Sequence, residues 1–387
     1  MLTIPLTADL IHGLLDLEPT DQGLQPHRLP TWARGQCPDP QLAMVEAQPA
    51  GGRLSFHTAA TIVELDAWPM RRNFAGLPPR PVGVFDLVVD GALFAQASVR
   101  GGELTTVDMV TGQTRSESVP AEPIRFDGLP EGIKRIDLWL PHNETTRLRA
   151  LRANAPVTAV AREGRMQWLH YGSSISQGSN AASPTGTWPA VAASLADVDL
   201  VNLGLGGSAL LDPFVARTIR DRPADAISLK IGINLVNMDA MRMRAFAPAV
   251  HGFIDTIRDG HPATPLLIVS PIACPIHEDT PGPGAFDIDA LRRGEVRFRA
   301  TGDPAERAAG KLTLNAIRGE LRAIVDRRAA ADPNLFYLDG RRLYGEADGA
   351  SLPLPDDLHP DAATHRVMGQ RFAQIVFADD GLLGGRG

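Results

Sequence analysis

The spacing of apolar residues changes near residue 165, and this change constrains the fold more than any other feature of the sequence. Between residues 50 and 165, apolar and polar side chains alternate in short runs such as RLSFHTAATIVELDAW and GVFDLVVDGALFAQASV. A period of two residues is typical of strands that bury one face, and the Asp90-Gly91 pair favours a hairpin turn. Several short strands at this spacing, without a convincing amphipathic helix, predict an antiparallel β-sandwich of the jelly-roll type.

After residue 165, near-continuous apolar runs alternate with helical patterns. Five runs have the composition of buried strands: MQWLHYG, DVDLVNLG, AISLKIG, PLLIVSP and LFYLDG. Strands buried on both faces and separated by helices form a parallel sheet with helices on each side. A chain of 387 residues is also long enough for two domains. We therefore predict an N-terminal β-sandwich over residues 1–165 and an α/β domain over residues 166–387, an αβα sandwich of flavodoxin-like type.

The connection at residues 272–310 is too long for an ordinary link between a strand and a helix. Insertions of this length are usually functional lids or flexible loops. Four of its arginines are most simply a solvated surface, and the alternative is that they bind the phosphates of an acyl-coenzyme A. These arginines are Arg292, Arg293, Arg297 and Arg299.

The formal net charge of −7 argues against nucleic acid as a partner, because a phosphate backbone requires a basic surface. No apolar run approaches the roughly 18 residues of a membrane helix, and the first residues lack the basic and apolar regions of a signal peptide. We therefore expect a cytoplasmic protein without nucleic-acid or membrane partners. Cys37 and Cys274 are far apart and lack the spacing of zinc ligands, which predicts buried free thiols and no metal.

Polar and glycine residues occur where the predicted parallel strands end. Ser174 follows the first strand, Gly207 the second and Asn234 the third, while Asp356 and His359 lie beyond the last strand. In open α/β sheets, ligands bind at the carboxyl ends of the strands. We therefore expect these residues to gather at one edge of the sheet.

This set of residues contains the parts of a serine acyl-transfer site. A serine hydroxyl is a weak nucleophile until a base within hydrogen-bond reach removes its proton. His359 would be that base, and Asp356 would hold its other ring nitrogen. The backbone N–H groups of Ser174 and Gly207 and the side-chain amide of Asn234 would form an oxyanion hole, in which the loss of one donor lowers turnover by about 10²–10³-fold.

At these positions the sequence resembles the GDSL or SGNH hydrolase family, whose four blocks carry Ser, Gly, Asn and His in that order. The matching segments are GSSISQGS, NLGLGGS, GINLVN and DLHP. The resemblance covers roughly residues 166–380. It implies an αβα fold, Ser174 as the nucleophile, and a Ser-His-Asp triad that acts on esters or thioesters without a cofactor.

Two positions depart from the family pattern. Ser173 stands where the family usually has an Asp before the nucleophile, and Leu235 stands where an Asp usually follows the Asn of the third block. Since the first Asp is commonly structural, the resemblance implies an altered hydrogen bond rather than a loss of activity. Ser173 and Ser176 are then supporting residues, and Asp357 is a less fitting alternative to Asp356.

The triad alone does not determine whether water or another hydroxyl takes the acyl group. A sandwich ahead of the catalytic domain is similar to the layout of GDSL acyltransferases that attach an aryl group, such as salicylyl, in tetracycline-type antibiotic biosynthesis. This resemblance implies an aryl-coenzyme A donor, an acyl-serine intermediate and a hydroxyl acceptor on a small molecule such as a polyketide. The alternative is a GDSL esterase or deacetylase that hydrolyses small acyl or sugar esters, since sandwich modules also accompany carbohydrate esterases.

Three other interpretations fit the sequence less well. GLGGSA has the spacing of a dinucleotide fingerprint and would indicate an oxidoreductase, but it follows the second strand and the next strand lacks the acidic residue that binds ribose. The segments 277–279 and 356–361 contain types of residue that bind metals, without a complementary ligand set. A binding protein built around the sandwich would have no need for the four blocks.

Overall fold

The computed structural model describes residues 1–108, 111–161 and 164–383. Contacts divide the chain into two compact units, each described by itself. The first unit comprises Met1–Thr31, Ala43–Arg165 and Ser183–Thr185. The second unit comprises Trp32–Leu42, Met166–Ala182 and Gly186–Gly387. A short segment from the N-terminal half of the sequence, residues 32–42, thus groups with the C-terminal half.

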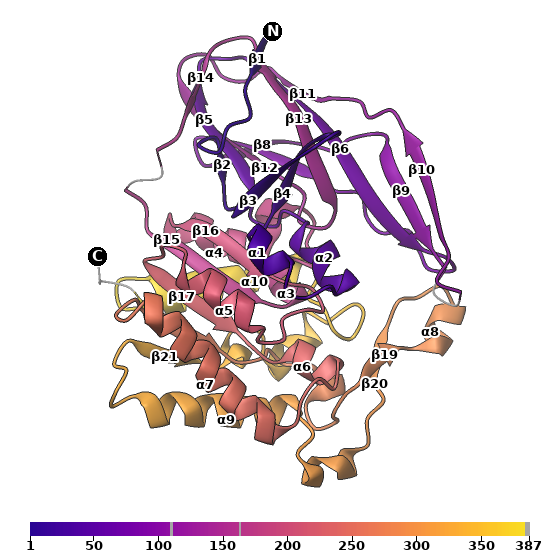
Figure 1. The fold of residues 1–387 in the computed structure, drawn as a ribbon, viewed down its shortest axis with the longest axis vertical. Helices are drawn as coiled ribbons and strands as arrows, with labels where there is room; N and C mark the ends of the chain where they lie inside the picture. The colour runs from indigo at the N-terminus through magenta and orange to yellow at the C-terminus, as the bar shows by residue number, and fades with distance from the viewer. Residues whose placement is uncertain (109–110, 162–163, 384–387) are drawn as a thin grey trace. The chain divides into compact units, whose positions relative to one another are not determined.

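Two β-sheets form the first unit (Figure 1). The larger sheet has the order β10 (Thr114–Val119), β9 (Gly102–Val107), β6 (Ile62–Phe74), β13 (Thr145–Ala153), β4 (Gly23–His27) and β3 (Asp16–Thr20), with β1 (Leu2–Ile4) beside β13 and β11 (Ile124–Asp127) beside β6. The smaller sheet has the order β14 (Val157–Ala159), β5 (Arg53–Thr58), β12 (Lys134–Trp139), β7 (Phe85–Val89) and β8 (Ala92–Ala97), with β2 (Ile11–His12) beside β5.

The two sheets share one hydrophobic core. Phe56 of β5 and Ile136 of β12 belong to the same buried cluster as Leu65 of β6 and Leu148 of β13. Every second residue along the first part of β6 is buried, as the period of two predicts. The prediction of strands between residues 50 and 165 is therefore confirmed, while the jelly-roll arrangement of their connections stays a prediction.

One strand pair of the first unit differs from the expected antiparallel pattern, because β9 runs parallel to β6. The β7–β8 hairpin lies between these two strands in sequence but belongs to the other sheet, and the chain re-enters the larger sheet in the direction of β6. The hairpin itself follows the sequence prediction. Asp90 and Gly91 form its two-residue turn in left-handed backbone, with φ of 48° and 84°.

A five-stranded parallel sheet lies at the centre of the second unit. Its order is β16 (Asp199–Gly204), β15 (Gln167–Gly172), β17 (Ala226–Lys230), β18 (Leu266–Val269) and β21 (Leu335–Leu338). All four pairings in this order are parallel. These strands are the five apolar runs of the sequence. Numbered by their order along the chain, they lie across the sheet in the order 2-1-3-4-5, which is that of flavodoxin-like sheets. The predicted α/β fold with a parallel sheet is confirmed.

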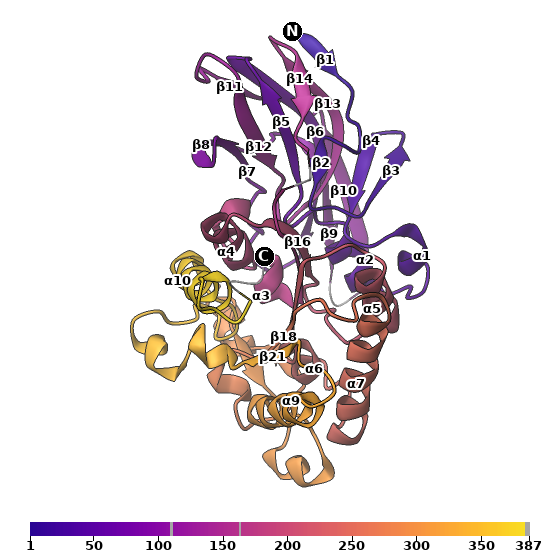
Figure 2. The ribbon, with the colours of Figure 1, turned by 90° about the vertical axis from the view of Figure 1, so that its left-hand side faces the viewer.

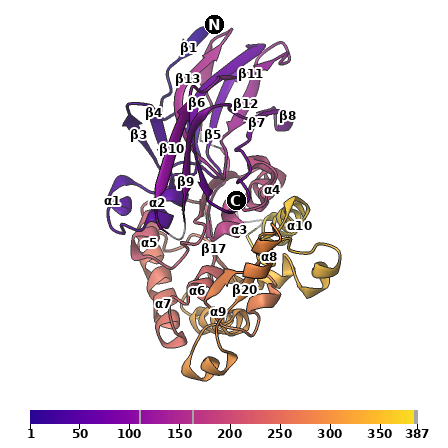
Figure 3. The same ribbon diagram turned by 90° about the vertical axis from the view of Figure 1, so that its right-hand side faces the viewer.

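Helices cover both faces of this sheet, which explains why every residue of β17 and β18 is buried. Figures 2 and 3 show α4 (Trp188–Ala196) and α10 (Ala362–Phe372) on one face, and α5 (Pro213–Arg220) and α7 (Met243–Gly260) on the other. Other helices of this unit include α3 (Ser174–Gln177), α6 (Ile233–Asn237) and α9 (Leu314–Arg328). Two short helices, α1 (Thr31–Arg34) and α2 (Pro40–Glu46), precede residue 50.

The long insertion after β18 contains an ordered hairpin. Strands β19 (Gly284–Phe286) and β20 (Phe298–Ala300) pair antiparallel and enclose α8 (Ile288–Arg292). We call residues 284–300 the insertion hairpin. The sequence predicts only a lid or flexible loop here, from the length of the connection. The hairpin was not predicted because strands of three residues are too short to show a period of two. Short 3₁₀ turns lie on either side of the hairpin, η2 (Pro275–His277) and η3 (Pro304–Ala309).

The two cysteines are free thiols, as predicted. Cys274 is buried, but Cys37 is only half-buried, so the prediction of burial is wrong for Cys37. It lies in the short link between α1 and α2, where little chain is available to cover it. Within the described residues, no helix combines the length and the apolar character needed to cross a membrane.

Candidate active site

Ser174 lies at a turn where strand β15 ends and helix α3 begins within two residues. Ser173 is the N-cap of α3 in extended backbone, and its Oγ accepts a hydrogen bond of 3.3 Å from the N–H of Ile175. Serine is among the preferred N-cap residues because its short side chain satisfies an unpaired N–H of the first turn. Gly178 ends the helix with a φ of 116°. At the position where the family usually has an Asp, the hydroxyl of Ser173 thus caps helix α3.

Ser174, His359 and Asp356 form a continuous hydrogen-bonded chain. The Oγ of Ser174 lies 3.0 Å from the Nε2 of His359, and the Nδ1 of His359 lies 2.8 Å from the Oδ2 of Asp356. Ser174 is half-buried, and the side chains of His359 and Asp356 are each 13% exposed. These distances allow a proton to pass from the serine to the histidine while the carboxylate orients the ring.

Asp356 accepts four hydrogen bonds. Its Oδ1 accepts from the N–H groups of Leu358 (3.0 Å) and His359 (2.6 Å), and its Oδ2 accepts from His359 and from the Nδ2 of Asn180 at 3.2 Å. Burial raises the pKa of Asp356, but the hydrogen bonds and the charge attraction of His359 outweigh it, so that the pKa lies below its usual value. Asp356 is therefore an ionised carboxylate that orients the ring of His359 through its Nδ1.

Asn180 is a site residue that the sequence reasoning missed. Its backbone is left-handed, with a φ of 65°, which asparagine tolerates better than most residues. A signal was present, since Asn180 directly follows the first block, only six positions after Ser174. Its contact with Asp356 spans 176 positions and has no local signature. Asp357, the alternative to Asp356, instead pairs with Arg297 at 3.3 Å and lies outside the chain of hydrogen bonds.

The structure places Gly207 on the loop after β16 and Asn234 in helix α6, which follows β17. Asn234 is 3% exposed, and its Oδ1 accepts a hydrogen bond of 3.1 Å from the N–H of Ala209. Because the oxygen of this amide is engaged, its NH₂ group is the end that remains to donate. A Cβ placed on Gly206 would lie 3.5 Å from the Cβ of Ser174, so the second block packs directly beside the serine.

Gly207 has a φ of 72°, in the left-handed region that favours glycine. The backbone conformation alone therefore favours a glycine at this position. Two glutamine side chains fix this loop: Gln177 accepts from the N–H of Gly206 at 2.9 Å, and Gln41 donates to the oxygen of Gly206 at 2.9 Å. Gln41 comes from the segment 32–42, and no sequence pattern indicated its position beside Gly206.

A second pair of serine and histidine lies behind the first. The Oγ of Ser176 is 2.8 Å from the Nε2 of His170, whose Nδ1 is 2.7 Å from the Oγ of Ser228. The indole of Trp168 donates to the same Ser228 oxygen at 2.8 Å. All four side chains are fully buried. Burial lowers the pKa of His170 to about 3, so this ring is neutral. Ser176 is a buried supporting residue.

Asn202 and Gly204 are the residues of the second block that contact α3. The buried amide of Asn202 donates to the oxygen of Ser176 at 2.8 Å and accepts from the N–H of Gly204 at 2.8 Å. A Cβ on Gly204 would lie 2.3 Å from the backbone nitrogen of Gln177, so any side chain there would push α3 away. This contact sets the position of the turn that carries Ser174.

The residues weighed as metal ligands have other contacts. Glu278 pairs with the guanidinium of Arg318, the ring of His277 shares a hydrogen bond of 3.1 Å with the oxygen of Thr280, and Asp361 caps α10. Within residues 1–108, 111–161 and 164–383, no group of three His, Cys, Asp or Glu side chains is arranged to bind a metal. The segment GLGGSA carries Gly206 and Gly207 to the side of Ser174.

The exposed arginines of the insertion pair mainly with nearby carboxylates. Arg292 contacts Asp289 at 2.9 Å, Arg293 contacts Glu295 at 3.8 Å, and Arg297 contacts both Glu295 and Asp357. These pairs lie at the surface, where such contacts are weak and exchange readily. Binding of coenzyme A phosphates by these arginines stays a prediction.

Comparison with known proteins adds to this geometry. Residues 167–276 match the GDSL-like Lipase/Acylhydrolase family. The solved structure of the salicylyl-acyltransferase SsfX3 from a tetracycline biosynthetic pathway is 27% identical, with a TM-score of 0.74, and the match covers 95% of this chain and 94% of that one. No curated protein matches the sequence.

Two further solved structures are similar in fold. A protein described as a GDSL-like lipase from Bacteroides ovatus is 19% identical, with a TM-score of 0.64, and the match covers 94% of this chain and 93% of that one. A family two carbohydrate esterase from Clostridium thermocellum is 13% identical, with a TM-score of 0.55, and the match covers 84% of this chain and 91% of that one.

Proposed function

We propose that this chain, an enzyme whose residues 167–276 form a GDSL-like lipase/acylhydrolase domain, is a serine acyltransferase. It moves an aryl acyl group from a coenzyme A thioester to a hydroxyl group of a small molecule such as a polyketide. The observation that carries the proposal is the hydrogen-bonded chain from Ser174 through His359 to Asp356. Similarity to a salicylyl-acyltransferase over 95% of the chain supports transfer rather than hydrolysis.

In the first half of the reaction, the Oγ of Ser174 attacks the thioester carbonyl carbon and His359 takes the hydroxyl proton at Nε2. The developing negative charge on the carbonyl oxygen is stabilised by the N–H groups of Ser174 and Gly207 and by the Asn234 amide. The carbon–sulfur bond then breaks, and the leaving thiolate takes the proton from His359. The products of this half are an acyl-serine and free coenzyme A.

In the second half, His359 removes the proton of the acceptor hydroxyl, and the acceptor oxygen attacks the acyl-serine carbonyl. The bond between that carbon and the Oγ of Ser174 breaks, and the serine oxygen recovers the proton from His359. The product is the ester of the acceptor. Throughout both halves, Asp356 stabilises the imidazolium form of His359 without taking its proton.

In terms of domains, we propose that residues 166–387 carry this chemistry and that residues 1–165 form an accompanying β-sandwich. Segment 32–42, which groups with the second unit, would then be required by the catalytic part. A chain that begins at residue 166 is expected to fold and to lose most of its activity.

The proposal is tested by intact-mass spectrometry of the full chain incubated with salicylyl-coenzyme A and no acceptor. We expect a mass increase of one salicylyl group in the wild type and in Ser176→Ala, and none in Ser174→Ala. Thioester consumption that depends on Ser174 without an adduct would instead indicate rapid hydrolysis by an esterase. Equal behaviour of the wild type and Ser174→Ala would contradict the site itself.

A further inference from the structure

The insertion hairpin brings two aromatic rings to the candidate active site. The ring of Phe298 lies edge-on to the ring of His359, with centroids 5.6 Å apart and planes at 75°. Phe286, on the paired strand, stacks on Phe298 at 4.9 Å. Both phenylalanines are half-buried, so each residue stays partly accessible to solvent. Edge-on and stacked pairs at these separations are favourable arrangements of aromatic rings.

Backbone and ionic contacts join the hairpin to the segment that carries His359. The N–H of Phe298 donates to the backbone oxygen of Asp356 at 2.9 Å. Arg297, the preceding residue, pairs with the carboxylate of Asp357 at 3.3 Å. Two neighbouring residues at the start of β20, Arg297 just before it and Phe298 within it, are thus bound to two neighbouring residues of the His359 segment. The position of the aromatic pair relative to the histidine is therefore defined by these contacts.

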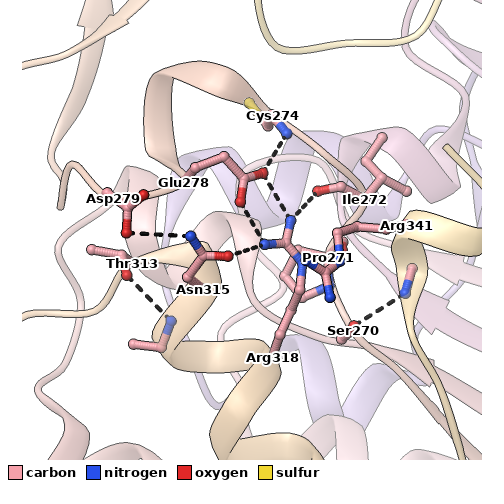
Figure 4. A network of polar contacts seen from close by, with 12 residues as sticks. Ser270, Pro271, Ile272, Cys274, Glu278, Asp279, Thr313, Asn315, Arg318 and Arg341 are labelled. Carbon is pink, nitrogen blue, oxygen red and sulfur yellow. Dashed lines mark hydrogen bonds and ion pairs between the residues drawn. The ribbon is translucent and has the colours of Figure 1, made fainter. Parts of the chain in front are cut away.

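The base of the insertion is also fixed at its first end. Figure 4 shows Arg318 of α9 pointing into the loop after β18, where it meets Glu278 and the backbone oxygens of Pro271 and Ile272. The guanidinium lies 3.0 Å from the first oxygen and 2.8 Å from the second, and 2.9 Å from the Oε1 of Glu278. Arg318 is 4% exposed, so this ion pair is shielded from water.

The second end of the insertion is fixed by a lysine. The Nζ of Lys311 lies 3.0 Å from Asp239 and 2.7 Å from Glu306, and Lys311 also forms a β-bridge with Arg242. Contacts with Arg318 and with Asp239 thus hold the two ends of the insertion. The insertion hairpin is therefore supported at its base.

The place of the aromatic pair determines which part of the substrate it contacts. His359 passes its proton to the leaving group in the first half of the reaction and takes a proton from the acceptor in the second, so both of these groups lie beside the histidine. The acyl group itself would lie toward the proposed oxyanion donors at Ser174, Gly207 and Asn234. Rings that contact His359 therefore line the side at which the acceptor enters.

We propose that Phe286 and Phe298 form part of the acceptor site and select an alcohol that carries an aromatic ring. This inference rests on the proposed acyl transfer and adds the chemical class of the acceptor. An aromatic acceptor stacks or packs edge-on against the accessible ring surface, which places its hydroxyl near the Nε2 of His359 and excludes competing water.

The test follows the fate of a single acyl-enzyme. The full chain is acylated with the benzoyl thioester of N-acetylcysteamine in the presence of benzyl alcohol or 1-propanol at equal concentration, and the ester and acid products are separated by chromatography. In the wild type, we expect a larger ratio of ester to acid with benzyl alcohol. In Phe298→Ala, we expect this preference to fall about 3- to 10-fold, which is the measured range for one aromatic pair.

Three controls make the result specific. Phe298→Leu keeps an apolar side chain of similar length and should lose the aromatic preference while it keeps transfer to 1-propanol. Ile288→Ala removes an exposed apolar side chain from the same hairpin and should change neither ratio. Thermal unfolding of each variant verifies that it is folded.

The outcomes separate the two proposals. An unchanged preference in Phe298→Ala, or an equal loss for both alcohols, would overturn the role of the aromatic pair. If Ser174→Ala turns over the benzoyl thioester as fast as the wild type, the proposed acyl transfer is overturned, and the acceptor site with it.

Discussion

Helix α3 presents two serines, two positions apart, and each is within hydrogen-bond distance of a histidine. Ser174 lies 3.0 Å from His359, and Ser176 lies 2.8 Å from His170. The second contact is the shorter one, yet only the first has the features of a reactive pair. A short distance between serine and histidine is therefore a poor criterion for a catalytic site.

The two pairs differ in what surrounds the histidine. His359 is partly exposed, and its second nitrogen faces the carboxylate of Asp356. His170 is fully buried, and its second nitrogen faces the hydroxyl of Ser228. Burial lowers the pKa of His170 to about 3, so a proton from Ser176 would create an imidazolium without a carboxylate to stabilise it. The comparison teaches that access and a compensating charge make the pair reactive.

The largest expected effect separates the two serines. Ser174→Ala is expected to lower kcat/KM for an aryl thioester by about 10⁴-fold or more, because it removes the nucleophile. Ser176→Ala is expected to stay within about tenfold of the wild type, since it removes only a buried hydrogen bond behind the turn. Steady-state kinetics of both variants measures the contrast. Comparable losses in the two variants would abolish the distinction drawn here.

A second contrast separates two neighbouring carboxylates. Asp356→Asn is expected to lower kcat by about 10²–10⁴-fold, because the amide no longer offers two acceptors to the His359 ring and its backbone N–H. Asp357→Asn is the matched control, because it changes the same functional group one position away and weakens only the pair with Arg297. Its kcat should remain within about threefold of the wild type, as expected for an exposed ion pair. A larger loss at Asp357 than at Asp356 would reverse the assignment.

The smallest expected effect concerns stability and pH. The folded protein depresses the pKa of His170 from 6.5 to about 3, so between these values the unfolded chain binds the extra proton. This group therefore contributes stability that is present above pH 6.5 and is lost as the pH falls toward 3, at about 1.4 kcal/mol per pH unit. Denaturant unfolding between pH 7 and pH 4 should show a shallower dependence in His170→Gln than in the wild type. Parallel curves would mean that His170 accepts a proton in the folded state.

Much of the second unit was predictable because its signals are local. Five apolar runs became the five parallel strands, and the polar residues at their ends converged because parallel strands end at the same edge. Ser174, His359 and Asp356 follow from that rule together with the family order of the blocks. Their catalytic roles stay predictions until the kinetic contrasts are measured.

The parts that the sequence did not reveal depend on contacts between distant segments. Asn180 reaches Asp356 across 176 positions, and Gln41 reaches Gly206 across 165. The parallel pairing of β9 with β6 depends on which sheet the intervening hairpin joins. The strands of the insertion hairpin are three residues long, too short for a period of two to be visible. None of these features leaves a pattern in the nearby sequence.

The insertion hairpin has a further consequence for how such enzymes diverge. The insertion that carries it is closed at its two ends by Arg318 and Lys311, and the ring of Phe298 contacts His359 without taking part in the parallel sheet. A segment closed at its base can change in length and composition while the sheet that supports it stays intact. Under the proposed acceptor role, exchange of residues 284–300 between relatives is expected to change the acceptor while the catalytic scaffold stays the same.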